Sequence, residues 1–464
     1  MTNISGGRLC MRRARRLYLQ QAPLEVLVDE LKTIARATSE GSWVSLPFQE
    51  TVVTELLGSA IAEEFPPRAE YVSRLTKMLL DDCDTAGEEV SEGLLRAKMA
   101  CVSTSQTAGR GFETAFESYW LPRRYADGCC PPLGHPRRFV EASEEGAFAS
   151  FRVANRDNEV GMRMWEAGRA LAEFCVAHAR WLEGKSVLEL GAGVGMTGAV
   201  VATCCGAREV VLTDYAPRVI NNLRFNVENN RSVLRGLLAN GCSGSSILPA
   251  EVSVRPLDWT DYVIDVGTES AQVSPLQHQQ GEDSNHSGGR ENGDDALGAP
   301  EVILAADVVY DNRYHPALVG VVRKALRRRP DTLVIFASTL RNAETMAAFH
   351  QCLQDAGIPW RGVDFFPGGD GQGSLPSSQG GNGHLDGVFR DDLDGQRQTV
   401  DKEDAFASRV GPNGYLTSRE QEQSDHGSTP TPVRGRGGSG LLWCSPGELE
   451  RVRFCVCGSG FRDE

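Results

Sequence analysis

The feature that most constrains this chain is a short apolar run that leads directly into closely spaced glycines. Residues 186–190 (SVLEL) have the composition of a buried strand, and Gly191, Gly193 and Gly195 follow at alternate positions. Glycine allows the backbone to turn sharply and lets a ligand approach main-chain N–H groups. A helical segment follows near residues 197–203. The order of strand, glycine loop and helix predicts an α/β fold that binds a nucleoside-containing ligand at a strand end.

Two residues beside this loop indicate which ligand it would bind. Glu189 stands just before the glycines, where its carboxylate would repel a pyrophosphate but would suit the amino group of a methionine moiety. The dinucleotide pattern G-x-G-x-x-G also requires glycine at the position that Met196 occupies. Both residues favour S-adenosylmethionine over a nicotinamide dinucleotide as the cofactor.

The next two predicted strands each end in an acidic residue. Asp214 closes the strand at 209–214, where a carboxylate can accept both hydroxyls of a ribose; the alternative is a helix N-cap ahead of Pro217. Asp258 and Trp259 follow the third strand, where they could hydrogen-bond to adenine and stack on it, although a tryptophan there is also a common core residue. These strand ends are therefore candidates for binding one nucleoside.

A second candidate group follows the fourth predicted strand, residues 301–307. Asp307 and Tyr310 leave an apolar run as a polar and aromatic pair, and Ala306 precedes them as a further cofactor contact. Asp307 could orient an attacking amine and help to draw off its proton, while the ring of Tyr310 would favour a cationic transition state. The alternative is a turn built on the same residues. Upstream, Trp165 introduces a helix and lies either in the core or at the cofactor mouth.

The order of the predicted elements gives the fold class. From about residue 140, short β-branched runs alternate with helical segments, which predicts a parallel, doubly wound sheet. No helical signal separates the last two strands, so they are expected to form a C-terminal antiparallel hairpin on a Rossmann-like seven-stranded α/β sheet. The predicted strands are 186–190, 209–214, 252–257, 301–307, 332–338, 360–366 and 451–457, and the helices between the first five lie near 197–203, 217–229 and 316–328.

The remaining sequence predicts further parts around this sheet. Residues 1–20 are basic and are expected to be flexible, with an organelle transit peptide as the alternative. Residues 21–125 carry apolar side chains at three- and four-residue spacing, which predicts a helical N-terminal region. The catalytic domain is expected over 140–457. Its inserts at 263–299 and 367–440 are rich in Gly, Ser and Asp and are predicted to be disordered.

Composition excludes several classes of function. The net charge is −14, and most of it comes from the two inserts, so it says little about the substrate. The chain has no extended basic face and no apolar run of membrane length, so we expect no direct nucleic-acid contact and no membrane. The thirteen cysteines are scattered, which predicts no metal site and reduced thiols in the cytoplasm. A monomer is expected.

With these residues in view, the chain from about 150 to 366, resuming at 441–457, resembles the seven-stranded class I methyltransferases. It is most similar to the eukaryotic protein-lysine methyltransferases that carry a D-x-x-Y motif after the fourth strand. The resemblance implies S-adenosylmethionine as cofactor and a protein-lysine substrate. The residues that match this family's cofactor-binding and D-x-x-Y motifs are Gly161, Trp165, Glu189, Gly191, Gly193, Gly195, Asp214, Asp258, Trp259, Asp307 and Tyr310.

Within that group the chain looks most like the elongation factor 2 lysine methyltransferases. The likeness lies in the helical extension, in Tyr119–Pro122 (YWLP) and in residues 337–345 (ASTLRNAET). It implies elongation factor 2 as the protein substrate. The chain departs from the group in its two inserts and at Glu159 and Val160, where a threonine pair is typical, and this departure affects any inference about the cofactor lid.

Three other functions remain open from the residues alone. A methyltransferase for another nucleophile, such as a histidine side chain or a small molecule, would carry similar sheet motifs. A non-catalytic cofactor-binding module would share the fold, but the intact loop and Asp307 argue against it. A nicotinamide oxidoreductase fits poorly with Glu189 and Met196.

Overall fold

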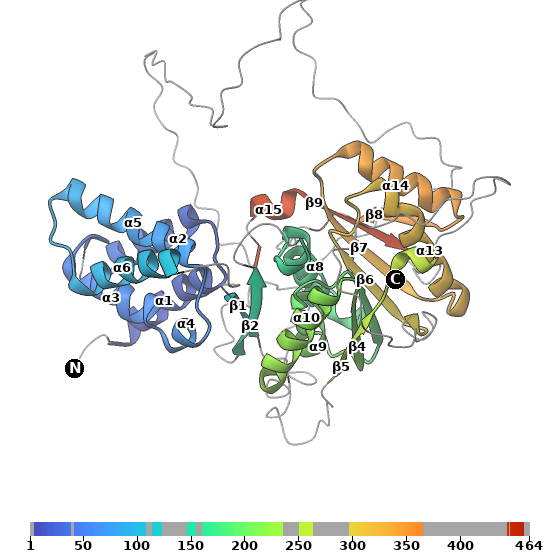
Figure 1. The fold of residues 1–464 in the computed structure, drawn as a ribbon, viewed down its shortest axis with the longest axis horizontal. Helices are drawn as coiled ribbons and strands as arrows, with labels where there is room; N and C mark the ends of the chain where they lie inside the picture. Colours follow the sequence, from blue (N-terminus) through green and yellow to red (C-terminus); the bar gives the residue numbers. More distant parts are fainter. Residues whose placement is uncertain are drawn as a thin grey trace, which may run out of the picture. The chain divides into compact units, whose positions relative to one another are not determined.

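The structure of this chain is a computed structural model (Figure 1). It describes residues 4–38, 41–107, 114–122, 146–154, 160–234, 250–262, 297–363, 365, 443–444 and 446–458. These residues belong to one compact unit, which comprises Met1–Gly373 and Ser439–Glu464. The predicted insert at 367–440 lies outside the described residues. So does the one at 263–299, except for its last three residues, of which Leu297 is buried.

In the described part of the chain, seven strands form one sheet in the order β5-β4-β3-β6-β7-β9-β8. The first five in this order are parallel, and β9 is antiparallel to both of its neighbours. This confirms the predicted Rossmann-like α/β fold with a C-terminal antiparallel hairpin. The strands are β3 (Ser186–Leu190), β4 (Glu209–Asp214), β5 (Glu251–Pro256), β6 (Val302–Ala306), β7 (Leu333–Thr339), β8 (Trp360–Val363) and β9 (Val452–Cys457).

The strand order contains a reversal that determines where a ligand can bind. From β3 the chain adds β4 and then β5 on one side, and it returns to place β6 on the other side of β3. In open α/β sheets the crevice outside the carboxyl ends of the strands at such a reversal is the usual ligand site. The glycine loop follows β3 and the Asp307 segment follows β6, so both candidate groups lie at this crevice.

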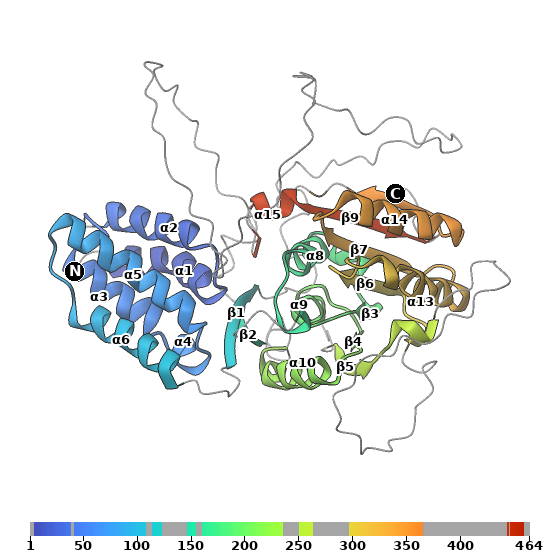
Figure 2. The ribbon, with the colours of Figure 1, turned by 45° about the horizontal axis from the view of Figure 1, so that its top comes forward.

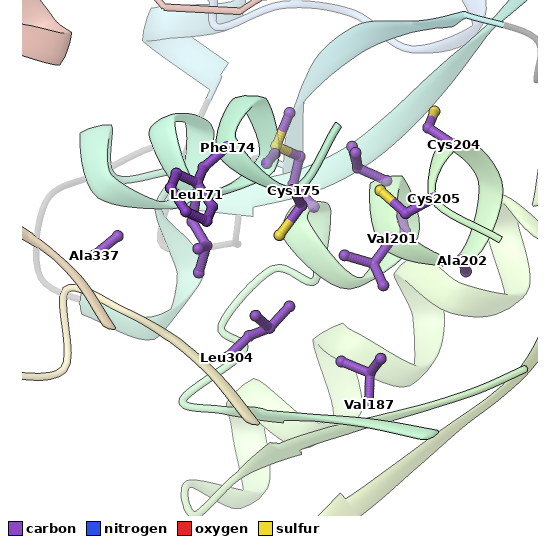
Figure 3. Close-up of a cluster of buried hydrophobic side chains, with 14 of the residues drawn as sticks. Leu171, Phe174, Cys175, Val187, Val201, Ala202, Cys204, Cys205, Leu304 and Ala337 are labelled. Carbon is purple, nitrogen blue, oxygen red and sulfur yellow. The ribbon is translucent and has the colours of Figure 1, made fainter. Parts of the chain in front are cut away.

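Helices cover both faces of the sheet (Figures 1 and 2). Side chains alternate along each strand, so Val187 and Leu304 belong to one hydrophobic cluster while Leu188 and Ile303 belong to the other. The first cluster includes residues of α8 (Glu166–Ala177), α9 (Met196–Cys204) and α10 (Pro217–Asn229); the second includes residues of α13 (His315–Arg328) and α14 (Ala343–Asp355). Figure 3 shows side chains of the first cluster, among them those from α8 and α9.

Helix α14 is an addition to the predicted elements, since the sequence analysis assigned no helix between the fifth and sixth strands. Its start is marked by Asn342, whose side chain accepts hydrogen bonds from the backbone N–H groups of Glu344 and Thr345. Phe349 and Leu353 are its buried residues. Their spacing of four places both on one face, which is the signal that identifies the helix.

The N-terminal region is helical from residue 4, and this corrects the prediction of a flexible segment over residues 1–20. Met11, Ala14 and Tyr18 recur at helical spacing and are buried, and Arg15 pairs with Glu55. The arginines between these three residues make the segment basic, so its composition alone does not show the apolar stripe. The helical elements are α1 (Ile4–Leu19), α2 (Leu24–Ala37), α3 (Leu46–Val52), the π-helical turn η1 (Val53–Leu57), α4 (Ala60–Glu64), α5 (Ala69–Ala86) and α6 (Glu92–Thr107).

A separate antiparallel pair of strands follows these helices. β1 (Thr114–Pro122) pairs with β2 (Gly146–Ala154) over their whole length. The predicted helical region at 21–125 therefore ends in a strand, and β1 is a correction to that prediction. The ion pair between Arg68 and Glu117, 2.7 Å between Nη1 and Oε1, joins β1 to the start of α5.

Two absences can be stated for the residues that the structure describes. None of their helices combines the length and the apolar composition needed to cross a bilayer. They also contain no group of three or more His, Cys, Asp or Glu side chains placed to hold a metal ion.

Candidate active site

A cavity of about 470 Å³ lies at the carboxyl ends of β3, β4, β5 and β6. Its volume is in the range of small-molecule and cofactor sites. Ten of the eleven residues predicted for the site line it. They are Trp165, Glu189, Gly191, Gly193, Asp214, Asp258, Trp259, Ala306, Asp307 and Tyr310.

Gly195 is the exception, and its predicted contact with the cofactor is not supported. It has φ +87°, and a Cβ added to it would lie 2.5 Å from Cδ1 of Leu223. Glycine is required there because the backbone is left-handed and α10 packs against it. Gly195 is therefore a packing residue, and it lies outside the cavity lining in the described part of the chain.

The other two loop glycines make room at the cavity. Gly191 has φ +63°, and a Cβ on it would meet Val308 at 3.0 Å and Trp259 at 3.3 Å. Gly193 has φ +55°, and its N–H donates to Oδ2 of Asp214 at 3.2 Å. This N–H already has a partner within the protein. Gly193 therefore contributes to the cavity by leaving space where a side chain would stand, and its hydrogen bond fixes the loop to the end of β4.

Glu189 is buried beneath the loop, with 2% of the residue exposed. Burial raises the pKa of Glu189 to about 8, against the opposing effect of hydrogen bonds from Thr197 and Gly198, and the negative charge of Asp214 raises it further. Its Oε2 has no hydrogen-bond partner among the described residues. An unpaired carboxylate oxygen beside a cavity fits an amino group of the ligand, because the ammonium would supply both a donor and the opposite charge.

Asp214 anchors the loop to the end of β4. Its Oδ1 accepts from the N–H groups of Tyr215 at 2.9 Å and Ala216 at 3.3 Å, while Oδ2 accepts from Gly193. Burial raises the pKa of Asp214, and these three hydrogen bonds oppose the rise. A carboxylate has about four acceptor positions, so one remains for a ribose hydroxyl. The predicted ribose contact and the alternative turn-capping role are both compatible with this geometry.

Asp258 and Trp259 form the wall that follows β5. Oδ1 of Asp258 accepts from the N–H of Thr260 at 2.9 Å and from its hydroxyl at 2.8 Å, so the carboxylate holds the turn. Trp259 is half-buried, and its ring lies against the backbone of Gly191. The indole of Trp259 therefore packs against the core and also lines the cavity, so the two alternatives predicted for it, a core residue and a wall of the site, both apply.

Asp307 occupies a strained position and has a different set of partners from the predicted one. Its φ is +53°, in the left-handed region that residues other than glycine rarely adopt. Its carboxylate accepts from the N–H and hydroxyl of Thr339, at 2.8 and 3.0 Å, and from both terminal nitrogens of Arg341, at 3.2 and 3.3 Å. These four bonds fill its acceptor positions. The geometry favours a positioning role and leaves no free acceptor to take a substrate proton.

Tyr310 stands at the mouth of the cavity with 53% of the residue exposed. Its ring centroid lies 6.4 Å from that of Tyr314, and Tyr215, which is 61% exposed, also lines the cavity. Partial burial raises the pKa of Tyr310, and Tyr314 and Tyr215 raise it further. Tyr215 and Tyr314 were not among the predicted site residues. Two features of the sequence point to them: Tyr215 follows Asp214 directly, and Tyr314 lies four residues after Tyr310.

Trp165 lies at the wall of the cavity. Its Nε1 donates to the carbonyl oxygen of Val160 at 2.9 Å, and the guanidinium carbons of Arg163 and Arg341 each lie 5.0 Å from the ring centroid. Cations at this distance are attracted by the indole face. Trp165 therefore lines the cavity, and Arg341 links it to Asp307. Neither arginine was among the predicted site residues.

Comparison with known proteins agrees with this geometry. A family model described as "Lysine methyltransferase" matches residues 153–273. The chain is 31% identical over 226 residues to the human "Protein-lysine N-methyltransferase EEF2KMT", covering 48% of this chain and 56% of that protein. It is 30% identical over 214 residues to the Emericella nidulans "Protein N-terminal and lysine N-methyltransferase efm7", covering 45% of this chain and 70% of the relative. The chain belongs to the lysine methyltransferase family.

This membership confirms the resemblance found in the sequence. The chain spans 56% of the length of the human relative. A solved methyltransferase from Pyrococcus furiosus is also similar, at 12% identity over 43% of this chain and 78% of that one, with a TM-score of 0.26. The family uses S-adenosylmethionine as methyl donor, and the unpaired Oε2 of Glu189 beside the opened glycine loop fits its amino group.

Proposed function

We propose that this chain transfers a methyl group from S-adenosylmethionine to the side-chain amine of a lysine in a partner protein. The single observation that carries the proposal is one cavity with a buried acid, Glu189, at its inner end and an exposed tyrosine, Tyr310, at its mouth. The inner end suits an ammonium group, and the open mouth suits a side chain that belongs to another molecule.

The residues that would hold the cofactor extend along the strand ends. Glu189 would pair with its amino group, Asp214 would accept a ribose hydroxyl, and Asp258 and Trp259 would contact adenine at the wall next to Gly191. When bound, the cofactor supplies a methyl group activated by a positively charged sulfur. These residues bind and orient that group and exclude water from around it.

The substrate side of the cavity would be formed by tyrosines. A lysine amine must lose its proton and much of its water before it can attack, and the reaction develops positive charge on its nitrogen. The rings of Tyr310, Tyr215 and Tyr314 would stabilise that charge through their faces. Asp307 would act indirectly, by holding Thr339 and Arg341 at the edge of the site.

Elongation factor 2 is the proposed substrate. The name of the human relative and the family resemblance of this chain support it. The nine cysteines whose side chains the structure describes are all free thiols, which supports the proposal that the enzyme works in the reducing cytoplasm. A protein N-terminal amine is a second candidate acceptor, because the name of the Emericella nidulans relative includes that activity.

The test is methyl transfer from radiolabelled S-adenosylmethionine to purified elongation factor 2 by the full chain. We expect label in elongation factor 2 with the wild type and a loss of at least tenfold in Tyr310→Ala. Met99→Ala, which truncates an exposed side chain on α6, is the control and should retain full activity. Label in another protein of an extract but none in elongation factor 2 would overturn the substrate assignment. Label confined to an N-terminal amine would favour the second acceptor.

A further inference from the structure

Three asparagines on and directly after α10 pair with the backbone of β2. Asn222 and Asn226 lie on one face of the helix, four residues apart, and Asn230 is the residue that caps its C-terminus. All three are buried, with 1–2% of each residue exposed. Buried amides require hydrogen-bond partners, and these find them on the edge of β2 that β1 leaves free.

The pairing imitates the bonds of a neighbouring strand. At Ser150, the N–H donates to Oδ1 of Asn230 at 2.8 Å, and the carbonyl accepts from Nδ2 of Asn230 at 2.9 Å. At Arg152, the N–H donates to Oδ1 of Asn226 at 2.8 Å, and the carbonyl accepts from Nδ2 of Asn222 at 3.0 Å and of Asn226 at 3.3 Å. The side chains thus satisfy an edge that would otherwise carry buried, unpaired backbone groups.

Asn226 differs from the other two because it also reaches the glycine loop. Its Nδ2 donates to the carbonyl oxygen of Val194 at 2.9 Å, in a buried contact. Val194 lines the cavity and lies between Gly193 and Gly195, both of which have left-handed backbone. A loop with two such glycines has many accessible conformations, so a fixed carbonyl between them restricts it strongly.

We propose that Asn226 is a positioning residue for the cofactor: it holds the Val194 carbonyl and so keeps the glycine loop in its binding-competent shape. Its amide uses one hydrogen for the loop and the other for Arg152, so it also ties the loop to the hairpin of β1 and β2. Asn230 makes the same kind of contact to the hairpin and none to the loop. This inference rests on the proposed cofactor for its affinity readout, but the loop geometry can be measured without any ligand.

The first experiment compares Asn226→Ala with Asn230→Ala in the full chain. The Kd of S-adenosylhomocysteine is measured by calorimetry, beside the thermal midpoint of each free variant. Both variants lose hairpin bonds, so both should melt earlier than the wild type. Asn226→Ala should bind about tenfold more weakly, as the loss of one buried hydrogen bond implies, while Asn230→Ala should stay within about twofold of the wild type. Equal weakening in both variants would assign Asn226 to the general stability of the hairpin.

A second measurement is independent of the cofactor. Amide hydrogen exchange over residues 190–196 of the free protein should increase in Asn226→Ala and remain unchanged in Asn230→Ala. Asn226→Asp should behave like Asn226→Ala in the loop, because it keeps the acceptor for Arg152 but has no amide donor for Val194. Unchanged loop exchange in Asn226→Ala would refute the inference. A wild type that binds no S-adenosylhomocysteine, with the exchange pattern as expected, would refute the proposed function and leave the positioning role supported.

Discussion

Cofactor binding to this cavity should release a proton from Glu189. Its pKa of about 8 in the free protein means that at pH 7 the carboxyl is protonated in roughly ten molecules for every one that is ionised. A bound ammonium favours the ionised form, so each binding event at pH 7 should release about 0.9 proton. Ionising the group at pH 7 costs about 1.4 kcal/mol, which weakens cofactor binding about tenfold relative to a site that is already ionised.

The raised pKa of Glu189 also makes the stability of the free protein depend on pH. The folded pKa lies above the ordinary value of 4.5, so the free protein is stabilised by the neutral carboxyl. That stability is complete below about pH 4.5 and is lost as the pH rises towards 8, by up to roughly 4–5 kcal/mol. Glu189→Gln keeps a neutral side chain at every pH. It should therefore be more stable than the wild type at pH 8 and should bind the cofactor more weakly.

Calorimetry with S-adenosylhomocysteine near pH 7 tests this prediction, in two buffers of different ionisation enthalpy. The apparent binding enthalpy of the wild type should differ between the buffers by the amount that about 0.9 proton requires. Glu189→Gln should show no difference, and Asp258→Asn, which changes an exposed acid of the same cavity, should resemble the wild type. Equal enthalpies in both buffers for the wild type would refute the assignment of a protonated Glu189.

Three further predictions concern residues around the site and beneath it. Gly195→Ala should lower the free energy of unfolding by about 2–4 kcal/mol because the added methyl group clashes with Leu223. Gly184→Ala is the control: Gly184 has a similar φ but nothing within 4 Å of an added Cβ, so this change should cost only about 1 kcal/mol. Equal losses in denaturant titrations would contradict the packing role. Glu301 accepts hydrogen bonds from Ser186 and Lys185, and these hold its pKa below the ordinary value. The stability that Glu301 contributes should therefore be present above about pH 4.5 and be lost on further acidification. Glu301→Gln should lower the free energy of unfolding by about 1–3 kcal/mol in denaturant titrations at pH 7, and a variant as stable as the wild type would exclude this network. Asp307→Asn should reduce kcat by roughly ten- to hundredfold by disturbing the pair with Arg341, with the Kd of S-adenosylhomocysteine within about twofold of the wild type; a large change in that Kd with kcat preserved would place Asp307 in cofactor binding instead.

The sequence predicted the strand ends well, for a local reason. Asp214, Asp258 and Asp307 each interrupt an apolar run, and such a change of polarity can be seen without knowing what packs nearby. The topology then brings the three to one edge of the sheet. Most of the sheet was predictable for a related reason, since the parallel strands β3, β4, β6 and β7 are largely buried and mostly apolar, whereas the edge strand β5 is partly exposed.

The parts that sequence reasoning missed depend on non-local packing. Arg341 lies far from Trp165 in the sequence but contacts its ring, and no local pattern pairs the two residues. The strands β1 and β2 satisfy each other across a long separation, so β1 was assigned to the preceding helices. Gly195 belongs to the same motif as Gly193, but only the position of Leu223 shows that it serves packing. Sequence alone cannot separate these two reasons for a glycine.

The central claim is that this cavity methylates a lysine side chain, and acid hydrolysis of the labelled product tests it most directly. Elongation factor 2 is labelled with the wild type and with Tyr310→Ala, hydrolysed, and separated beside standards of methylated amino acids. The account predicts that the label elutes as ε-N-methylated lysine and falls at least tenfold in the variant. Label that elutes as methylhistidine or as an N-terminal methyl amino acid would contradict the assignment of lysine. Label that is unchanged in Tyr310→Ala would contradict the assignment of this cavity.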